Sequence, residues 1–249
     1  MAGPSKWANI KRRKAAEDAK RGKLFSKFSR MITVAAREGG GDPAANVRLR
    51  LAIEKARAAN MPMENIERAI ARGTGGGGGA NYEEMVYEGY APGGVAVLID
   101  ALTDNRNRTA GELRHIFSKH GGNLGEAGCV AWMFDTMGVI TLDRDKLELD
   151  EDGLLEVALE AGAEDVEWDD DEVTIVCEPA RFQEVKEALE SQKLPIIEAE
   201  VTKRPSNAVE VPLSDAAKVL RLLDALEDHD DVQAVHTNAN IPEEALEPA

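Results

Sequence analysis

The residues with the clearest chemical capability are the Lys and Arg residues close to the N-terminus, in the segment Ser5–Arg30 (SKWANIKRRKAAEDAKRGKLFSKFSR). Residues 1–80 carry 17 Lys and Arg against 7 Asp and Glu, although the whole chain has a formal net charge of -16. Clustered cations attract phosphate groups and release their condensed counterions. The contrast between a basic N-terminal segment and an acidic remainder predicts a nucleic-acid-binding module joined to acidic domains.

Two groups of these cations are spaced so that they could contact nucleic acid. Residues 11–14 form a compact basic cluster four residues after Trp7, whose indole could stack on a base or anchor the module's core. Cations recur at 20, 23, 27 and 30, a spacing that places them on one face of a helix predicted over about 23–37. A solvated basic tail is the alternative, but the contrast in charge with the rest of the chain favours nucleic acid. The predicted contact residues in this segment are Lys6, Trp7, Lys11, Arg12, Arg13, Lys14, Lys20, Arg21, Lys23, Lys27 and Arg30.

A second candidate contact lies in the segment 104–109 (DNRNRT), between a predicted strand and a predicted helix. A helix N-terminus offers free N–H groups and a favourable dipole to an anion, so Arg106 and Arg108 could bind a phosphate there. In the alternative interpretation, Asp104 and the asparagines form the turn and both arginines pair with neighbouring carboxylates. The residues leave these two interpretations equally open.

Several long sequence segments in the chain resemble those of the YebC/PmpR family of bacterial regulators. They are SKWANIK at 5–11, DAKRGKLF at 18–25, TVAAREGGGDPAAN at 33–46 and RLAIEKARAANMP at 50–62, followed by NIERAI, YEGYAPGGVAV and DNRNRT. The resemblance covers nearly the whole chain. At Pro4 and Arg12 the chain departs from the family, which has His at these positions, but neither difference removes positive charge. It implies a DNA-binding transcriptional regulator. The same family also includes members regarded as translation factors at the ribosome, one branch being a mitochondrial translational activator.

No pattern of catalytic or metal-binding residues stands out. His115 and His120 are five residues apart, whereas a spacing of four would place two ligands on one helix face. The sequence contains no GxSxG, and neither cysteine lies beside a histidine. The glycine run at 73–79 follows a helix and lacks the GK[ST] of a phosphate-binding loop. We therefore predict a non-enzymatic protein with no catalytic residues, no metal site and no cofactor.

Residues 143–172 form a strongly acidic region, with 15 Asp and Glu against 2 Lys and Arg. Such a region could bind a divalent metal or a basic protein partner, but it lacks the glycine and the terminal glutamate of an EF-hand loop. A solvated acidic face is the favoured interpretation. It would repel nucleic acid, which confines binding to the N-terminal module and the DNRNRT segment.

The periodicity of the apolar residues predicts an α+β protein, with an N-terminal helical bundle followed by two ferredoxin-like α+β domains, three domains in all. The glycines at 75–79 are predicted to form a linker and hinge after the basic module 1–80. Later helices are expected at 109–120, 154–161, 182–190 and 216–226, and strands at 83–90, 95–103, 129–134, 139–142, 173–177, 199–203, 209–211 and 232–237. The resemblance further implies a discontinuous middle domain, 81–134 plus 205–240, with the acidic domain 135–204 inserted into it.

The composition also suggests where the protein works. No apolar run approaches the roughly 18 to 20 residues that span a bilayer. Cys129 and Cys177 are two lone thiols without a CxxC pair, as expected in a reducing compartment. We expect a cytoplasmic protein that does not engage membranes.

The leading hypothesis is a DNA-binding transcriptional regulator. Its module shows no short-turn helix-turn-helix signature, so recognition of shape and backbone is favoured over base readout. Backbone recognition suits structured RNA equally well, so the alternative is a translation factor that binds the ribosome through ribosomal or transfer RNA. A third hypothesis is an interaction scaffold that binds a basic protein partner through the acidic domain.

Overall fold

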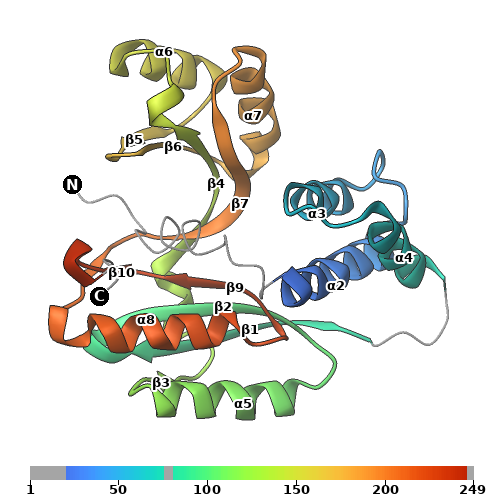
Figure 1. Cartoon of the computed structure of the whole chain (residues 1–249), viewed down its shortest axis with the longest axis vertical. Coiled ribbons are helices and arrows are strands. Elements are labelled where there is room, and N and C mark those ends of the chain that lie inside the picture. Colours follow the sequence, from blue (N-terminus) through green and yellow to red (C-terminus); the bar gives the residue numbers. More distant parts are fainter. Residues whose placement is uncertain (1–20, 76–80, 246–249) are drawn as a thin grey trace. The chain divides into compact units, whose positions relative to one another are not determined.

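The computed structural model describes residues 21–75 and 81–245 (Figure 1). Contacts divide these residues into two compact units. The acidic unit consists of Trp132–Glu210 and His236–Asn240, and the main unit consists of the remaining described residues. The predicted class, helices at the N-terminus followed by mixed helices and antiparallel sheets, is confirmed. The division into three domains stays a proposal, in which the main unit would hold two of them.

Three helices form the N-terminal bundle: α2 (Arg21–Gly39), α3 (Val47–Ala58) and α4 (Met63–Thr74). Their apolar faces meet in a core that includes the fully buried Ile32, Leu49 and Ile66. Asn46 begins α3, because its side chain accepts a hydrogen bond from the N–H of Leu49. Both α3 and α4 pack mainly on α2, which is therefore the central helix of the bundle.

One detail of the bundle differs from the sequence-based expectation, and a second explains its close packing. Only residues 59–62 separate α3 from α4, a connection as short as the turn of a helix-turn-helix motif, with Asn60 in the left-handed region at φ 61°. Gly73 lies inside α4, which ends at Thr74 with Gly75 as its cap. A Cβ on Gly73 would lie 2.4 Å from the carbonyl oxygen of Thr33, so the absence of a side chain lets α4 approach α2 closely.

The second part of the main unit is a four-stranded sheet with the strand order β3-β1-β2-β9. β1 (Glu83–Ala91) and β2 (Val95–Thr103) form an antiparallel hairpin joined by the 3-10 turn Pro92–Gly94. β3 (Asn123–Leu124) and β9 (Val232–Thr237) lie at the two ends of the strand order. α5 (Arg106–Lys119) and α8 (Leu213–Glu227) contact each other. β2 is buried along nearly its whole length, which explains why its sequence is apolar apart from Asp100 and the terminal Thr103.

Two predicted boundaries in this region are wrong. α5 begins at Arg106, because Asn105 caps the helix by accepting a hydrogen bond from the N–H of Arg108, so part of the predicted DNRNRT turn is helical. The predicted strand 129–134 is a loop that leads into a 3-10 helix, Ala131–Met133, and the next strand begins only at Phe134. Backbone N–H groups of this loop donate to the carboxylate of the buried Glu88 rather than to a neighbouring strand.

The acidic unit has the predicted ferredoxin-like arrangement. Its elements follow the order β4 (Phe134–Asp143), α6 (Glu151–Ala161), β5 (Asp165–Trp168), β6 (Glu172–Cys177), α7 (Phe182–Ser191) and β7 (Ile196–Pro205). All neighbours in the sheet β5-β6-β4-β7 are antiparallel, as in the split βαβ fold. The sheet of the main unit, β3-β1-β2-β9, begins with the β1–β2 hairpin. Its connections therefore differ from those of the split βαβ fold. A short parallel pair, β8 (Val209–Glu210) and β10 (Ala239–Asn240), also belongs to the acidic unit.

Two expectations concerned the state of the cysteines and the absence of membrane-spanning segments. Neither Cys129 nor Cys177 forms a disulfide within the described residues, and Cys177 is buried. Across residues 21–75 and 81–245, no helix combines the length and the apolar character that crossing a bilayer requires.

Candidate nucleic-acid interface

The predicted contact residues divide into those that the structure describes and those that lie outside the described residues. Lys23, Lys27 and Arg30 lie on α2, and Arg106 and Arg108 lie in the first turn of α5. Arg21 is the first residue of α2, and its side chain is outside the description. The candidates that precede the described residues are Lys6, Trp7, Lys11, Arg12, Arg13, Lys14 and Lys20.

Two lysines of α2 meet the C-terminal end of α8. Lys23 Nζ donates a hydrogen bond to the carbonyl oxygen of Asp228 at 3.2 Å, and Lys27 Nζ donates to that of Glu227. Carbonyl groups in the last turn of a helix lack intrahelical partners and carry partial negative charge. In the structure these lysines therefore cap α8, and their contact with nucleic acid stays a prediction.

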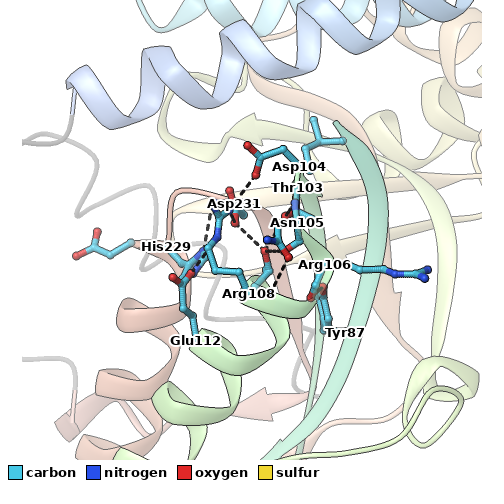
Figure 2. Close-up of polar contacts among 12 residues, drawn as sticks. Tyr87, Thr103, Asp104, Asn105, Arg106, Arg108, Glu112, His229 and Asp231 are labelled. Atoms are coloured by element: carbon cyan, nitrogen blue, oxygen red, sulfur yellow. Dashed lines mark hydrogen bonds and ion pairs between the residues drawn. The ribbon is translucent and has the colours of Figure 1, made fainter. Parts of the chain in front are cut away.

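Asp231 connects α2 to α5. Its side chain is only 3% exposed, and each carboxylate oxygen faces a guanidinium group. Arg108 Nη2 lies 2.5 Å from Oδ2 (Figure 2). Arg30 Nη1 lies 2.6 Å from Oδ1, and Thr109 Oγ1 donates to Oδ2 at 2.7 Å. Burial by itself would raise the pKa of this carboxyl, but the hydrogen bonds from Thr109, Arg30 and Arg108 outweigh burial and lower the pKa of Asp231 from 3.8.

A short chain of hydroxyl groups positions Thr109. Because the Thr109 hydroxyl donates its proton to Asp231, Thr103 Oγ1 must donate the hydrogen bond that joins the two threonines across 2.7 Å. Thr103 Oγ1 accepts in turn from the N–H of Asn105 at 2.9 Å. Thr103 and Thr109 are both buried, so this segment anchors Asp231 as well as beginning α5.

The two arginines of the DNRNRT segment have different surroundings. Arg108 pairs with Asp231 and lies 3.2 Å from Asp104 and 3.8 Å from Glu112. These contacts match the interpretation in which Arg108 pairs with neighbouring carboxylates. Arg106 is exposed and makes no ion pair among residues 21–75 and 81–245. Figure 2 shows its side chain pointing away from Asp231. Of the two, Arg106 is therefore the one placed to meet an external phosphate.

Glu112, His229 and Asp231 offer three potential metal ligands within 4.8 Å of one another. His229 Nδ1 accepts from the N–H of Asp231 at 3.1 Å, so the proton sits on Nε2, which donates to Glu112 Oε2 at 2.8 Å. The Asp231 oxygens already face two guanidinium groups, which would repel a metal cation. The cluster is therefore a hydrogen-bond network. Sequence reasoning missed it because no local pattern links residues 112 and 229.

The arginines of α3 and α4 provide further positive charge. Arg48 pairs with Glu38 and Glu84, and Arg68 pairs with Glu64. Arg57 and Arg72 are exposed and make no ion pair within the described ranges. These two guanidinium groups are therefore available to an external anion.

Comparison with protein families gives two matches that together span most of the chain. The family described as "TACO1/YebC protein N-terminal domain" matches residues 5–76. The family described as "TACO1/YebC second and third domain" matches residues 82–239. The two matches meet at the glycine-rich segment.

Curated relatives are similar over their full length. A protein of Dictyoglomus turgidum is 58% identical over 247 residues, which is 99% of either chain. A protein of Halothermothrix orenii is 59% identical over 248 residues, covering 99% of this chain and 98% of the relative. Each is named "Probable transcriptional regulatory protein".

One solved structure shares the fold along nearly the whole chain. The crystal structure of a conserved hypothetical protein from Aquifex aeolicus is 53% identical, with a TM-score of 0.86. The similarity covers 98% of this chain and 100% of the other.

Proposed function

Because the chain belongs to the TACO1/YebC family, we propose that it is a non-catalytic, DNA-binding regulator of transcription. The names of its relatives support a role in transcription. The observation that carries the nucleic-acid part is the separation of charge between the two units. The acidic region 143–172 lies within Trp132–Glu210 of the acidic unit, whereas the basic bundle 21–75 belongs to the main unit. Phosphate would therefore be attracted to the basic bundle and repelled by the acidic unit.

Exposed cations of the main unit that make no ion pair would supply the contacts with phosphate. Arg57, Arg72 and Arg106 are exposed without ion pairs in the described part of the chain, and the basic cluster 11–14 precedes them in sequence. Contacts of this kind fix the position of a protein on the phosphate backbone without reading the bases. The four-residue connection between α3 and α4 supports the DNA hypothesis, because turns of that length occur in helix-turn-helix proteins.

Translation is the second candidate, and a specific observation favours it. The cationic face of α2 contacts the end of α8 and Asp231, so α2 is not a free helix that could enter a major groove in this arrangement. Recognition would then depend on backbone contacts, which suit ribosomal or transfer RNA as well as DNA.

Crosslinking of the protein to nucleic acid in growing cells, followed by sequencing of the DNA and the RNA fractions, tests both candidates. We expect enrichment at a small number of promoters. A variant with Lys11, Arg12, Arg13 and Lys14 replaced by Ala serves as the control, and its signal should fall in whichever fraction is specific.

The outcomes separate the two candidates. Recovery of ribosomal and transfer RNA without promoter enrichment would replace the transcriptional function by the translational one. A wild-type signal no stronger than that of a sample without crosslinking, in both fractions, would contradict nucleic-acid binding altogether. Equal signals in the wild type and the four-alanine variant would only remove residues 11–14 from the interface.

A further inference from the structure

A hollow on the main unit collects three basic side chains from two helices. It is lined by Pro92, Lys119, His120, Gly121, Lys218 and Arg221 and has a volume of about 330 Å³. Lys119 is the last residue of α5, whereas Lys218 and Arg221 lie three residues apart on one face of α8. α5 and α8 (Figure 1) contact each other. Cations about a hundred residues apart in sequence therefore line the same hollow.

The Lys119 side chain is not required to complete the end of α5. A lysine in the last turn of a helix often interacts with the free carbonyl groups there. In α5, the carbonyl groups of residues 116–118 instead accept hydrogen bonds from the N–H groups of residues 120–122. Gly121 makes this closure possible, because it adopts the left-handed conformation at φ +76°. The ammonium group is therefore left for another partner.

Carboxylates balance only part of the positive charge around the hollow. Lys218 Nζ lies 3.4 Å from Asp215 Oδ1, and both side chains are at the surface. Lys119 and Arg221 are exposed and make no ion pair with any residue in 21–75 or 81–245. Three like charges around one hollow repel one another, and an anion placed between them would relieve that repulsion.

We propose that this hollow is a phosphate-binding site that holds one phosphate of a nucleic-acid backbone. The planar guanidinium of Arg221 can bind two phosphate oxygens, the ammonium groups of Lys119 and Lys218 act as point charges, and the His120 ring can donate a hydrogen bond. The proposal rests on the proposed function, to which it adds a contact outside the N-terminal module. A phosphorylated small molecule has the same chemistry, and the experiment below distinguishes the two sources.

Two triple variants of the full chain test the site. K119A/K218A/R221A removes the charges, whereas K119R/K218R/R221K keeps them. Binding to a mixed-sequence DNA duplex and to total transfer RNA is measured over a range of salt concentrations. We expect the alanine variant to lose affinity by roughly tenfold at physiological salt, with the slope of log K against log salt flattened by about 1, because one phosphate contact is lost. The charge-conserving variant should retain the wild-type slope, as should Arg114→Ala, which removes an exposed cation of α5 outside the hollow.

A second measurement uses inorganic phosphate and does not depend on nucleic acid. The ring resonance of His120, assigned by its loss in His120→Gln, is followed by NMR during a phosphate titration. A saturable shift is expected in the wild type and in the charge-conserving variant, and no such shift is expected in K119A/K218A/R221A. Because all three substituted side chains are at the surface, we expect the alanine variant to fold, which thermal unfolding checks.

The two measurements together decide the proposal. A flattened slope together with the phosphate shift supports the site and its nucleic-acid source. An unchanged slope with a saturable phosphate shift keeps the site and assigns it to a phosphorylated small molecule. If the wild type binds neither nucleic acid, the proposed function fails, while the phosphate titration still decides the site. An unchanged slope without a phosphate-dependent shift overturns the proposal. A flattened slope without a phosphate shift would also overturn the site, because loss of general positive charge would then explain the slope.

Discussion

Arg30 and Asp231, which are 201 residues apart in sequence, form an ion pair of 2.6 Å that joins α2 to the loop before β9. Arg30 also donates to the carbonyl oxygen of Leu102 at 3.2 Å and lies over the ring of Tyr82, 4.9 Å from its centroid. The buried carboxylate is further held by Arg108. Asp231 is thus one of the points at which the helical bundle is attached to the rest of the main unit.

Asp231 should make the protein more sensitive to acid. Its pKa is lowered in the folded protein, so the stabilisation from the ionised carboxylate is fully present above the unfolded value of 3.8 and is lost as the pH falls through the folded pKa. Urea unfolding at about pH 5 and at about pH 2.5 should show a larger loss of unfolding free energy in the wild type than in Asp231→Asn.

Asp231→Asn should also destabilise the protein at neutral pH. Asp231→Asn should lower the free energy of unfolding by about 1 to 3 kcal/mol, because Arg30 and Arg108 lose their charged partner. Asp230→Asn, at the exposed neighbouring position, is the matched control and should change little. Equal acid sensitivity of the wild type and Asp231→Asn would show that this carboxylate is not a source of the acid response.

Two glycines inside helices should respond to alanine with opposite signs. Gly73→Ala places a methyl group 2.4 Å from the carbonyl oxygen of Thr33 and should destabilise the protein by about 1 to 3 kcal/mol. Gly111 in α5 is exposed, and a Cβ at this position would meet nothing within 4 Å, so Gly111→Ala should stabilise by up to about 1 kcal/mol. Thermal unfolding of the two variants measures both effects. A stabilising Gly73→Ala would contradict the close approach of α4 to α2.

Glu88 should stabilise the loop that replaces the predicted strand 129–134. Its carboxylate is buried and accepts from the N–H groups of Gly128, Val130 and Ala131 at 2.6 to 2.8 Å. Glu88→Gln turns one acceptor into a donor that faces N–H groups, so we expect a loss of about 1 to 3 kcal/mol. Hydrogen exchange should accelerate at these three amides. Glu83→Gln, exposed on the same strand, is the control, and equal exchange in both variants would argue against this role.

The basic cluster at 11–14 should dominate the salt dependence of nucleic-acid binding. Replacing all four cations by Ala should flatten the slope of log K against log salt by up to about 3 to 4, if each neutralises a phosphate. K23A/K27A provides the comparison, because these lysines contact the end of α8. A slope lowered by about 2 in that variant would extend the interface to α2, whereas an unchanged slope would leave these lysines as caps of α8. An unchanged slope in the four-alanine variant would remove the cluster from the interface.

Local patterns were enough to predict the class of the protein and most of its elements. The 3.6-residue period predicts α2 and α7 within a few residues, and the mainly apolar segment 95–103 predicts β2 at its observed bounds. The α2 cations share one face for the same reason, since helical spacing depends only on neighbouring residues. The concentration of acidic residues at 143–172 is likewise a property of the sequence.

Only the tertiary structure decided which partners these charges have. The contacts of Lys23 and Lys27 with α8, and of Arg30 with Asp231, each join residues about 200 positions apart, and no short-range pattern encodes such a contact. The hollow between α5 and α8 exists because two helices distant in the sequence pack together. The sequence thus determined where the positive charge lies along the chain, whereas packing determined which cations are neutralised and which remain open, because a side chain's electrostatic environment depends on whatever the fold brings within a few ångströms.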